Sequence, residues 1–227
     1  MSKLKHDEME QDVLIEYSTR FLYFYRNNKG VVWGTGIGIV LAVGLTIGYF
    51  VHTAQQTAEA EELLGTAEEY LMQGEYDRAL YGDEEAFTLG FIQIADNYSR
   101  TPSGNLANYY SAAVLYEIEE YEEALHYIVR FRVPDGITGV GPISLHAAIL
   151  AELERYVEAA EMFVEAAYWD ENDTTTPYNL YEAAIAYQTA GNIEEAVSLL
   201  ETIIDEYPDS DIFSGAQRLK GRLTARN

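Results

Sequence analysis

The chain has 227 residues, of which 48% are apolar and 23% are charged, and its formal net charge is −24. This balance is typical of a globular protein and leaves enough apolar residues for a sizeable core. Such strong negative charge repels phosphate backbones, which argues against nucleic acid as a partner. The sequence contains no cysteine, so disulfides, thiolate metal sites and a cysteine nucleophile are excluded.

The excess of negative charge lies in one part of the chain. Residues 1–30 contain five basic and five acidic groups, whereas residues 52–227 contain 9 basic and 33 acidic ones. The acidic part indicates a solvated surface that favours solubility. Within the balanced part, apolar residues recur at helical spacing over residues 12–26. This spacing predicts an amphipathic helix that lies on the cytoplasmic membrane surface or packs against another membrane protein.

A long apolar run follows this segment. From Val31 to Val51 the sequence has 21 residues without a charge, and a membrane-spanning helix needs about 20. Trp33 and Tyr49, near its two ends, fit the aromatic belts of the two membrane surfaces. A GxxxG pattern within the run either lets a partner helix approach closely or is ordinary glycine in a membrane helix. Because the apolar core of a signal peptide has about 7–15 residues, the run predicts an uncleaved anchor.

Basic residues next to the span predict its orientation. Arg20, Arg26 and Lys29 lie just before it, and no lysine or arginine follows until Arg78. Basic residues favour the cytoplasmic side. We therefore expect a single-pass protein of a bacterial inner membrane with residues 1–30 in the cytoplasm, residues 31–51 in the membrane and residues 52–227 in the periplasm. The predicted membrane-interface residues are Trp33, Tyr49, Arg26 and Lys29.

One phrase recurs four times beyond residue 57, where the apolar pattern is helical almost throughout, with short breaks. Its copies are GEYDRA, EEYEEA, ERYVEA and GNIEEA, and their last residues, 45, 35 and 37 positions apart, are Ala79, Ala124, Ala159 and Ala196. A glycine or polar residue at the start closes one helix in a tight turn. The alanine is small because the two helices of a hairpin approach closest there. The longer first interval predicts an insertion of about ten residues relative to a repeat of about 34.

This pattern resembles the tetratricopeptide repeat family over residues 58–208. Counted from each phrase, the small and large apolar positions of that family fall on Ala67, Ala112, Ala147 and Ala184, on Tyr70, Leu115, Leu150 and Tyr187, and on Ile128, Phe163 and Leu200. Pro208 stands where the fourth repeat should end. The family's early tryptophan is missing, and two of the four turns lack glycine. An unrelated helical bundle is the alternative.

The resemblance implies an all-α fold: a single transmembrane helix, then an α-solenoid of about four tetratricopeptide-like hairpins and a C-terminal capping helix. We place the capping helix at residues 211–225, since such arrays need a polar end. It carries a basic cluster that suits a helix C-terminus or contacts lipid head groups or an acidic partner: Arg218, Lys220, Arg222 and Arg226.

No pattern of residues indicates catalysis. Glu123 and His126 form one ExxH pair, but a di-iron bundle needs two such pairs and further glutamates. Asp170–Asp173 begins like a calcium loop, yet it lacks the sixth-position glycine and has Tyr181 where a bidentate glutamate belongs. We therefore interpret it as a loop between repeats and expect no enzyme activity, no metal, no cofactor and no small-molecule substrate.

Repeats of this kind present a concave surface lined by the first helix of each hairpin. By register, the inward positions are Tyr109, Tyr116, Glu117, Tyr178, Tyr181 and Gln188. Tyrosine suits peptide capture because it offers a large apolar face and one hydroxyl at low entropic cost. The alternative is that these rings only pack against the neighbouring repeat or the capping helix.

The layout also resembles the family of the ancillary, tetratricopeptide-containing subunit of the bacterial Sec translocon. The residues that carry this resemblance are Phe91–Tyr98 and Thr101–Tyr110. Membership would imply translocon subunits, periplasmic chaperones or nascent chains as partners, besides membrane lipid around the span. The alternatives are a structural scaffold of an envelope assembly and a stable accessory subunit of another membrane complex.

Overall fold

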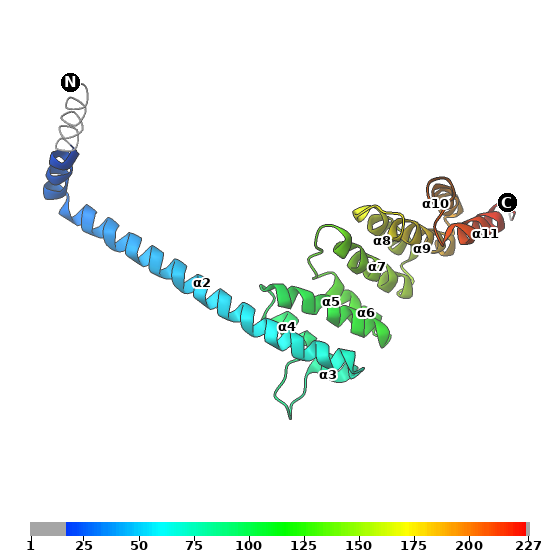
Figure 1. Ribbon diagram of the computed structural model, residues 1–227, viewed down its shortest axis with the longest axis horizontal. Helices are drawn as coiled ribbons and strands as arrows, with labels where there is room; N and C mark the ends of the chain where they lie inside the picture. Colours follow the sequence, from blue (N-terminus) through cyan, green and yellow to red (C-terminus); the bar gives the residue numbers. More distant parts are fainter. Residues whose placement is uncertain (1–16, 226–227) are drawn as a thin grey trace, which may run out of the picture. The chain divides into compact units, whose positions relative to one another are not determined.

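A computed structural model describes residues 17–225 of the chain (Figure 1). Residues 12–16 of the predicted amphipathic segment and Arg226 of the basic cluster lie outside the described residues. Residues 17–27 are helical. The chain divides into two compact units, Met1–Gln55 and Gln56–Asn227. Every regular element in the described part of the chain is a helix, which confirms the predicted all-α class. A single isolated β-bridge in this part joins Asp83 and Thr88.

The first unit contains the apolar part of helix α2, which runs from Lys29 to Met72 and so includes the predicted span. The most apolar window of 18 residues has a mean hydropathy of 2.0, and none of it is buried. Val40 is 71% exposed and Leu45 76% exposed. A continuous run of large exposed apolar side chains is typical of a helix that crosses a membrane. Within the described chain, α2 is the one helix long and apolar enough to be a candidate membrane span.

The second unit is a row of antiparallel hairpins, each made of a first and a second helix (Figure 1). Hairpin 1 joins the end of α2 to α3 (Tyr76–Tyr81) and α4 (Phe91–Asn97). Hairpin 2 is α5 (Pro102–Glu117) with α6 (Tyr121–Ile128), and hairpin 3 is α7 (Ile137–Glu152) with α8 (Tyr156–Trp169). Hairpin 4 is α9 (Thr175–Ala190) with α10 (Ile193–Glu206), and α11 (Phe213–Thr224) follows.

The four repeated phrases form one and the same turn. In hairpin 2 the amide of Glu119 donates to the carbonyl of Tyr116 at 3.1 Å, and that of Glu120 donates to Leu115 at 2.9 Å. The other three turns repeat both bonds, which together cap the first helix in the manner of a Schellman motif. The motif needs a left-handed residue, and the φ angles are 76° at Gly74, 66° at Glu119, 59° at Glu154 and 88° at Gly191.

Alanines close the contact between the two helices of each hairpin. The eight predicted close-packing alanines are all 0% exposed: Ala67, Ala112, Ala147, Ala184, Ala79, Ala124, Ala159 and Ala196. Larger side chains fill the space on either side, with Leu115 and Leu200 fully buried. Burying such a leucine contributes about 1.5–3 kcal/mol relative to leaving it exposed. The predicted repeat register is therefore the register of the folded hairpins.

The extra residues of hairpin 1 form a loop between α3 and α4. Residues 82–90 leave and re-enter the hairpin at Gly82 and Gly90, whose backbones touch. The Asp83 carboxylate accepts the amides of Glu85 at 2.9 Å and Ala86 at 3.2 Å, which orders the loop. The second helix of hairpin 1 is thus split into α3 and α4, as the long first interval predicts.

Helix α11 covers the last hairpin. Ala216, Leu219 and Leu223 on one side of α11 are buried against hairpin 4. On its solvent side, Lys220 pairs with Glu201 of α10 at 2.8 Å. A polar outer face over an apolar inner one is what the end of a repeat array needs for solubility. The helix begins at Phe213, two residues later than predicted.

Candidate functional site

A valley runs between the first helices of hairpins 3 and 4. The lining residues include one stripe at spacings of three or four, which begins at Thr174 just before α9 and continues along that helix with Tyr178, Glu182, Ile185 and Thr189. A matching stripe on α7 runs from Ile137 to Glu152. Because α7 and α9 run in the same direction, the two stripes face each other along their length. The valley holds two hollows, one at each end.

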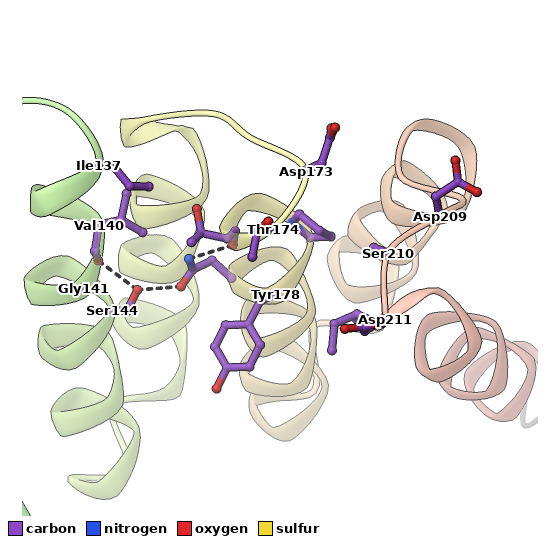
Figure 2. Close-up of a pocket in the computed structure, with 14 residues that line it drawn as sticks. Ile137, Val140, Gly141, Ser144, Asp173, Thr174, Tyr178, Asp209, Ser210 and Asp211 are labelled. Atoms are coloured by element: carbon purple, nitrogen blue, oxygen red, sulfur yellow. Dashed lines mark hydrogen bonds between the residues drawn. The ribbon is translucent and has the colours of Figure 1, made fainter.

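The larger hollow, which we call the acidic groove, has a volume of 810 Å³ and lies at the N-terminal ends of α7 and α9 (Figure 2). Its apolar lining comes from Ile137, Val140, Pro177, Tyr178 and Ile212. Its charged lining comes from Asp173, Asp209 and Asp211 in the loops before α9 and α11. This combination offers a contact for an apolar side chain within a negatively charged rim.

A hydrogen-bond chain fixes the wall of the acidic groove (Figure 2). Ser144 Oγ of α7 lies 2.7 Å from Asn179 Oδ1 of α9 and 2.9 Å from the Val140 carbonyl, and Asn179 Nδ2 donates to the Thr175 carbonyl at 2.9 Å. Asn179 is only 1% exposed. A buried amide whose oxygen and nitrogen are both bonded holds a single geometry. The bond therefore sets how α7 and α9 meet beneath the groove.

The loop that carries Asp173 is shaped by Asn172. Its Oδ1 accepts the amides of Thr174 at 2.9 Å and Thr175 at 2.8 Å, and these would otherwise be free at the start of α9. The buried hydroxyl of Thr176 donates to the Ala167 carbonyl at the end of α8. Asp170–Asp173 is thus a loop between repeats, as predicted, and α9 begins at Thr175.

The smaller hollow, which we call the tyrosine pocket, has a volume of 170 Å³. It lies at the C-terminal ends of α7 and α9, and Tyr116 of α5 reaches it from hairpin 2. Tyr116 also packs on Tyr121, with 5.6 Å between ring centroids. Its polar walls are Glu152 and Glu182. Three successive hairpins therefore contribute to this end of the valley.

The valley is electrostatically negative. Burial raises the pKa of the half-buried Glu182 carboxyl. The charge of Glu182, then burial, raises the pKa of Tyr178. Burial first and then the charge of Glu152 raise the pKa of Tyr116, and Tyr178 adds to this effect. Glu182 lines the tyrosine pocket and acts on Tyr178, which lines the acidic groove. The two hollows are therefore neighbours on one surface.

The six predicted concave residues have different surroundings. Tyr116 and Tyr178 line the valley, and Tyr178 is 50% exposed. Tyr109 packs on Phe131 with 5.6 Å between ring centroids. Tyr181 lies against Gly215 of α11 and lines a separate hollow with Arg218 and Arg222. The remaining two residues line neither hollow of the valley: Glu117 is exposed and Gln188 is partly buried.

Sequence patterns did not identify the acidic residues of the valley. Glu152 and Glu182 are glutamates in a chain rich in them, and Asp173, Asp209 and Asp211 lie in loops that only the stacking of hairpins brings together. The spacing of residues 174, 178, 182, 185 and 189, three or four apart, is a signal in the sequence from which this stripe could have been predicted. Within residues 17–225, no group of three side chains is placed to hold a metal ion, and His126 is exposed on α6.

These features define the class of the protein: an α-solenoid of antiparallel helical hairpins whose first helices line a valley. Residues 178–210, which contain most of hairpin 4, match the family model described as tetratricopeptide repeat. The chain therefore contains a tetratricopeptide repeat, a module that generally binds other proteins. Comparison with curated proteins and with solved structures gave no match.

Proposed function

We propose that this chain is a membrane-anchored adaptor that binds other proteins and catalyses no reaction. The observation that carries the proposal is the valley between α7 and α9, with the half-exposed ring of Tyr178 in the acidic groove at one end. Aromatic side chains on a rigid helical surface are typical of protein-binding sites. The uncovered apolar helix α2 would hold the array at a bacterial inner membrane, with residues 1–30 cytoplasmic and residues 52–227 periplasmic.

As the cellular role, we favour an accessory of the Sec translocon that passes emerging chains to periplasmic chaperones. The resemblance of Phe91–Tyr98 and Thr101–Tyr110 to the ancillary translocon subunits supports this role. In the structure these residues form α4 and most of α5. A structural scaffold of the envelope and a stable subunit of another membrane complex are the competing roles.

Site-specific crosslinking in intact cells tests the proposal. A photo-crosslinking residue replaces Tyr116 or Tyr178 in the valley, Leu45 in the apolar part of α2, or Glu122 or Glu194 on second helices as controls. We expect secreted chains or chaperones at the valley positions and translocon subunits at Leu45. The controls should give neither.

Other outcomes of the same experiment would overturn the translocon role. Many different envelope partners without any secreted chain would indicate a scaffold. Co-purification with another complex at fixed stoichiometry would indicate a stable subunit. Recovery of the protein in the soluble fraction after a carbonate wash would remove the membrane anchor, and with it the whole proposal.

A further inference from the structure

The side chains that line the valley carry only one sign of charge. Asp173, Asp209 and Asp211 line the acidic groove, and Glu152 and Glu182 line the tyrosine pocket. No lysine, arginine or histidine is among the described residues that line either hollow. A surface of this kind selects partners by charge as well as by shape, because like charges are repelled from it.

We propose that the acidic groove binds a cationic and partly apolar segment of a partner protein. One apolar side chain of the segment enters between α7 and α9, and lysine or arginine residues beside it pair with the aspartates of the rim. The proposal rests on the adaptor function above and names the class of partner that the adaptor takes.

The apolar side chain expected in the partner segment follows from the side chains that line the groove. Ile137 is 55% exposed and Tyr178 50% exposed, although both lie beside the buried Val140 and Pro177. The volume of 810 Å³ is in the range of about 300–1,000 Å³ that ligand sites have. Covering these side chains removes apolar surface from water, which favours an aliphatic or aromatic side chain as the occupant.

The positive charge expected in the partner segment follows from the aspartates at the rim of the groove, which are unpaired among the described residues. The ion pairs among residues 17–225 join Arg78, Arg130, Arg155 and Lys220 to acids elsewhere, and none of them includes Asp173, Asp209 or Asp211. The rim therefore keeps its negative charge available to a partner. That charge also argues against an anionic lipid surface as the occupant.

Ser210 gives a further reason to expect a peptide. Ser210 lines the groove and is partly buried, and its Oγ, which is itself buried, has no hydrogen-bond partner among the described residues. Buried polar atoms are normally bonded. Rotation of the Ser210 side chain toward the groove would let its Oγ donate to a backbone carbonyl of a bound segment.

The test uses the full chain in non-ionic detergent and a dye-labelled peptide, Gly-Lys-Leu-Phe-Lys-Gly, blocked at both ends. Fluorescence anisotropy measures its binding. Two control peptides replace both lysines by glutamate, or Leu-Phe by Ser-Ser. We expect at least about tenfold weaker binding of each control peptide.

Two triple variants separate the groove from the general charge of the protein. The variant D173N/D209N/D211N removes three charges from the rim. The variant E122Q/E165Q/E194Q removes three exposed charges from the second helices α6, α8 and α10. The first should weaken binding about tenfold or more, and the second by less than about twofold. Tyr178→Ala should weaken binding without changing its dependence on salt.

Equal loss in both triple variants, or equal binding of the Ser-Ser peptide, would overturn the proposal. So would wild-type dimerisation in sedimentation velocity that D173N/D209N/D211N abolishes, because a second copy would then be the occupant. The adaptor function is judged separately: crosslinks from Tyr116 to partner proteins in cells would support it even if the peptide does not bind.

Discussion

Ser144 and Asn179 join two successive hairpins through a 2.7 Å hydrogen bond beneath the acidic groove. The bond directly links two first helices that otherwise pack mainly through α8. Asn179→Ala removes this bond and opens a cavity, and the single hydroxyl proton of Ser144 then goes to the Val140 carbonyl. We expect a loss of about 1–3 kcal/mol in the free energy of unfolding, measured by urea denaturation of the full chain in detergent.

Ser144→Ala is the matched control for that substitution. It removes the same bond, but it deletes only the Oγ of a partly buried side chain. Asn179 keeps its bond to the Thr175 carbonyl. We expect a loss of only about 0.5–1.5 kcal/mol. A larger loss for Ser144→Ala than for Asn179→Ala would show that the asparagine is not the residue that fixes the contact.

Two of the four hairpin turns place a glutamate in a left-handed conformation. Glu119 has a φ of 66° and Glu154 a φ of 59°, where the other turns have glycine. The left-handed region costs a residue with a Cβ about 1–2 kcal/mol, and the greater freedom of glycine in the unfolded chain offsets part of the gain. We expect Glu119→Gly and Glu154→Gly each to raise the unfolding free energy by about 0.5–1 kcal/mol.

Charge and conformation are separated by two further variants. Glu119→Gln keeps the side chain and should change the unfolding free energy by less than about 0.5 kcal/mol. Gly191→Ala places a Cβ at a φ of 88° and should lower it by about 1 kcal/mol. If Glu119→Gln stabilises as much as Glu119→Gly, repulsion among the acidic residues is the cause.

Two tyrosines make stability depend on alkaline pH. Burial and a hydrogen bond to Glu68 raise the pKa of Tyr110 to about 12. Burial and the 3.0 Å bond to Glu171 raise the pKa of Tyr207 to about 12. The folded state keeps these protons to a higher pH than the unfolded chain does, so stability is full below about pH 10 and falls as the pH rises to 12.

The double variant Y110F/Y207F tests this dependence. Its melting temperature should fall less steeply than that of the wild type between pH 10 and 12, although the variant is less stable at pH 7 because it lacks the two hydroxyl bonds. Differential scanning calorimetry at closely spaced pH values makes the comparison. Parallel curves for the two proteins would mean that other groups cause the alkaline loss.

Local signals in the sequence predicted the hairpins well. The phrase that ends in Ala124 or Ala159 encodes a turn, a helix start and a close contact within six residues, and each of these depends on near neighbours in the chain. The buried alanines and the helix breaks therefore lie where the phrase places them. One feature was not predicted, the left-handed conformation of Glu119 and Glu154, because sequence rules favour glycine at that position.

The valley was harder to predict because it depends on how hairpins stack. Asp173 and Asp211 are separated by all of hairpin 4, and nothing near either residue indicates that they share a groove. Tyr181 occupies a position expected to face inward, yet it packs against Gly215, since the capping helix covers that side of α9. Tyr116 of α5 lines the tyrosine pocket and Tyr178 of α9 lines the acidic groove, and their role in binding stays a prediction.

Two glycines of α7 give a final test of how this packing is fixed. A Cβ at Gly139 would overlap Trp169 Nε1 and the Pro134 carbonyl, which are themselves joined by a 3.1 Å hydrogen bond. Gly141, two residues later, has no atom within 4 Å of the same position. Gly139→Ala must displace the Trp169 ring or the backbone at Pro134, so we expect a loss of about 1–3 kcal/mol.

Gly141→Ala changes the same helix by the same methyl group without that clash. Because alanine favours a helix interior over glycine by about 1 kcal/mol, it should stabilise the protein by up to that amount. Trp169 fluorescence during urea unfolding reports both effects, and only Gly139→Ala should shift the emission of the folded protein. Equal changes for the two variants would mean that Trp169 can leave the start of α7 freely, and that its bond to Pro134 does not fix the loop between hairpins 2 and 3.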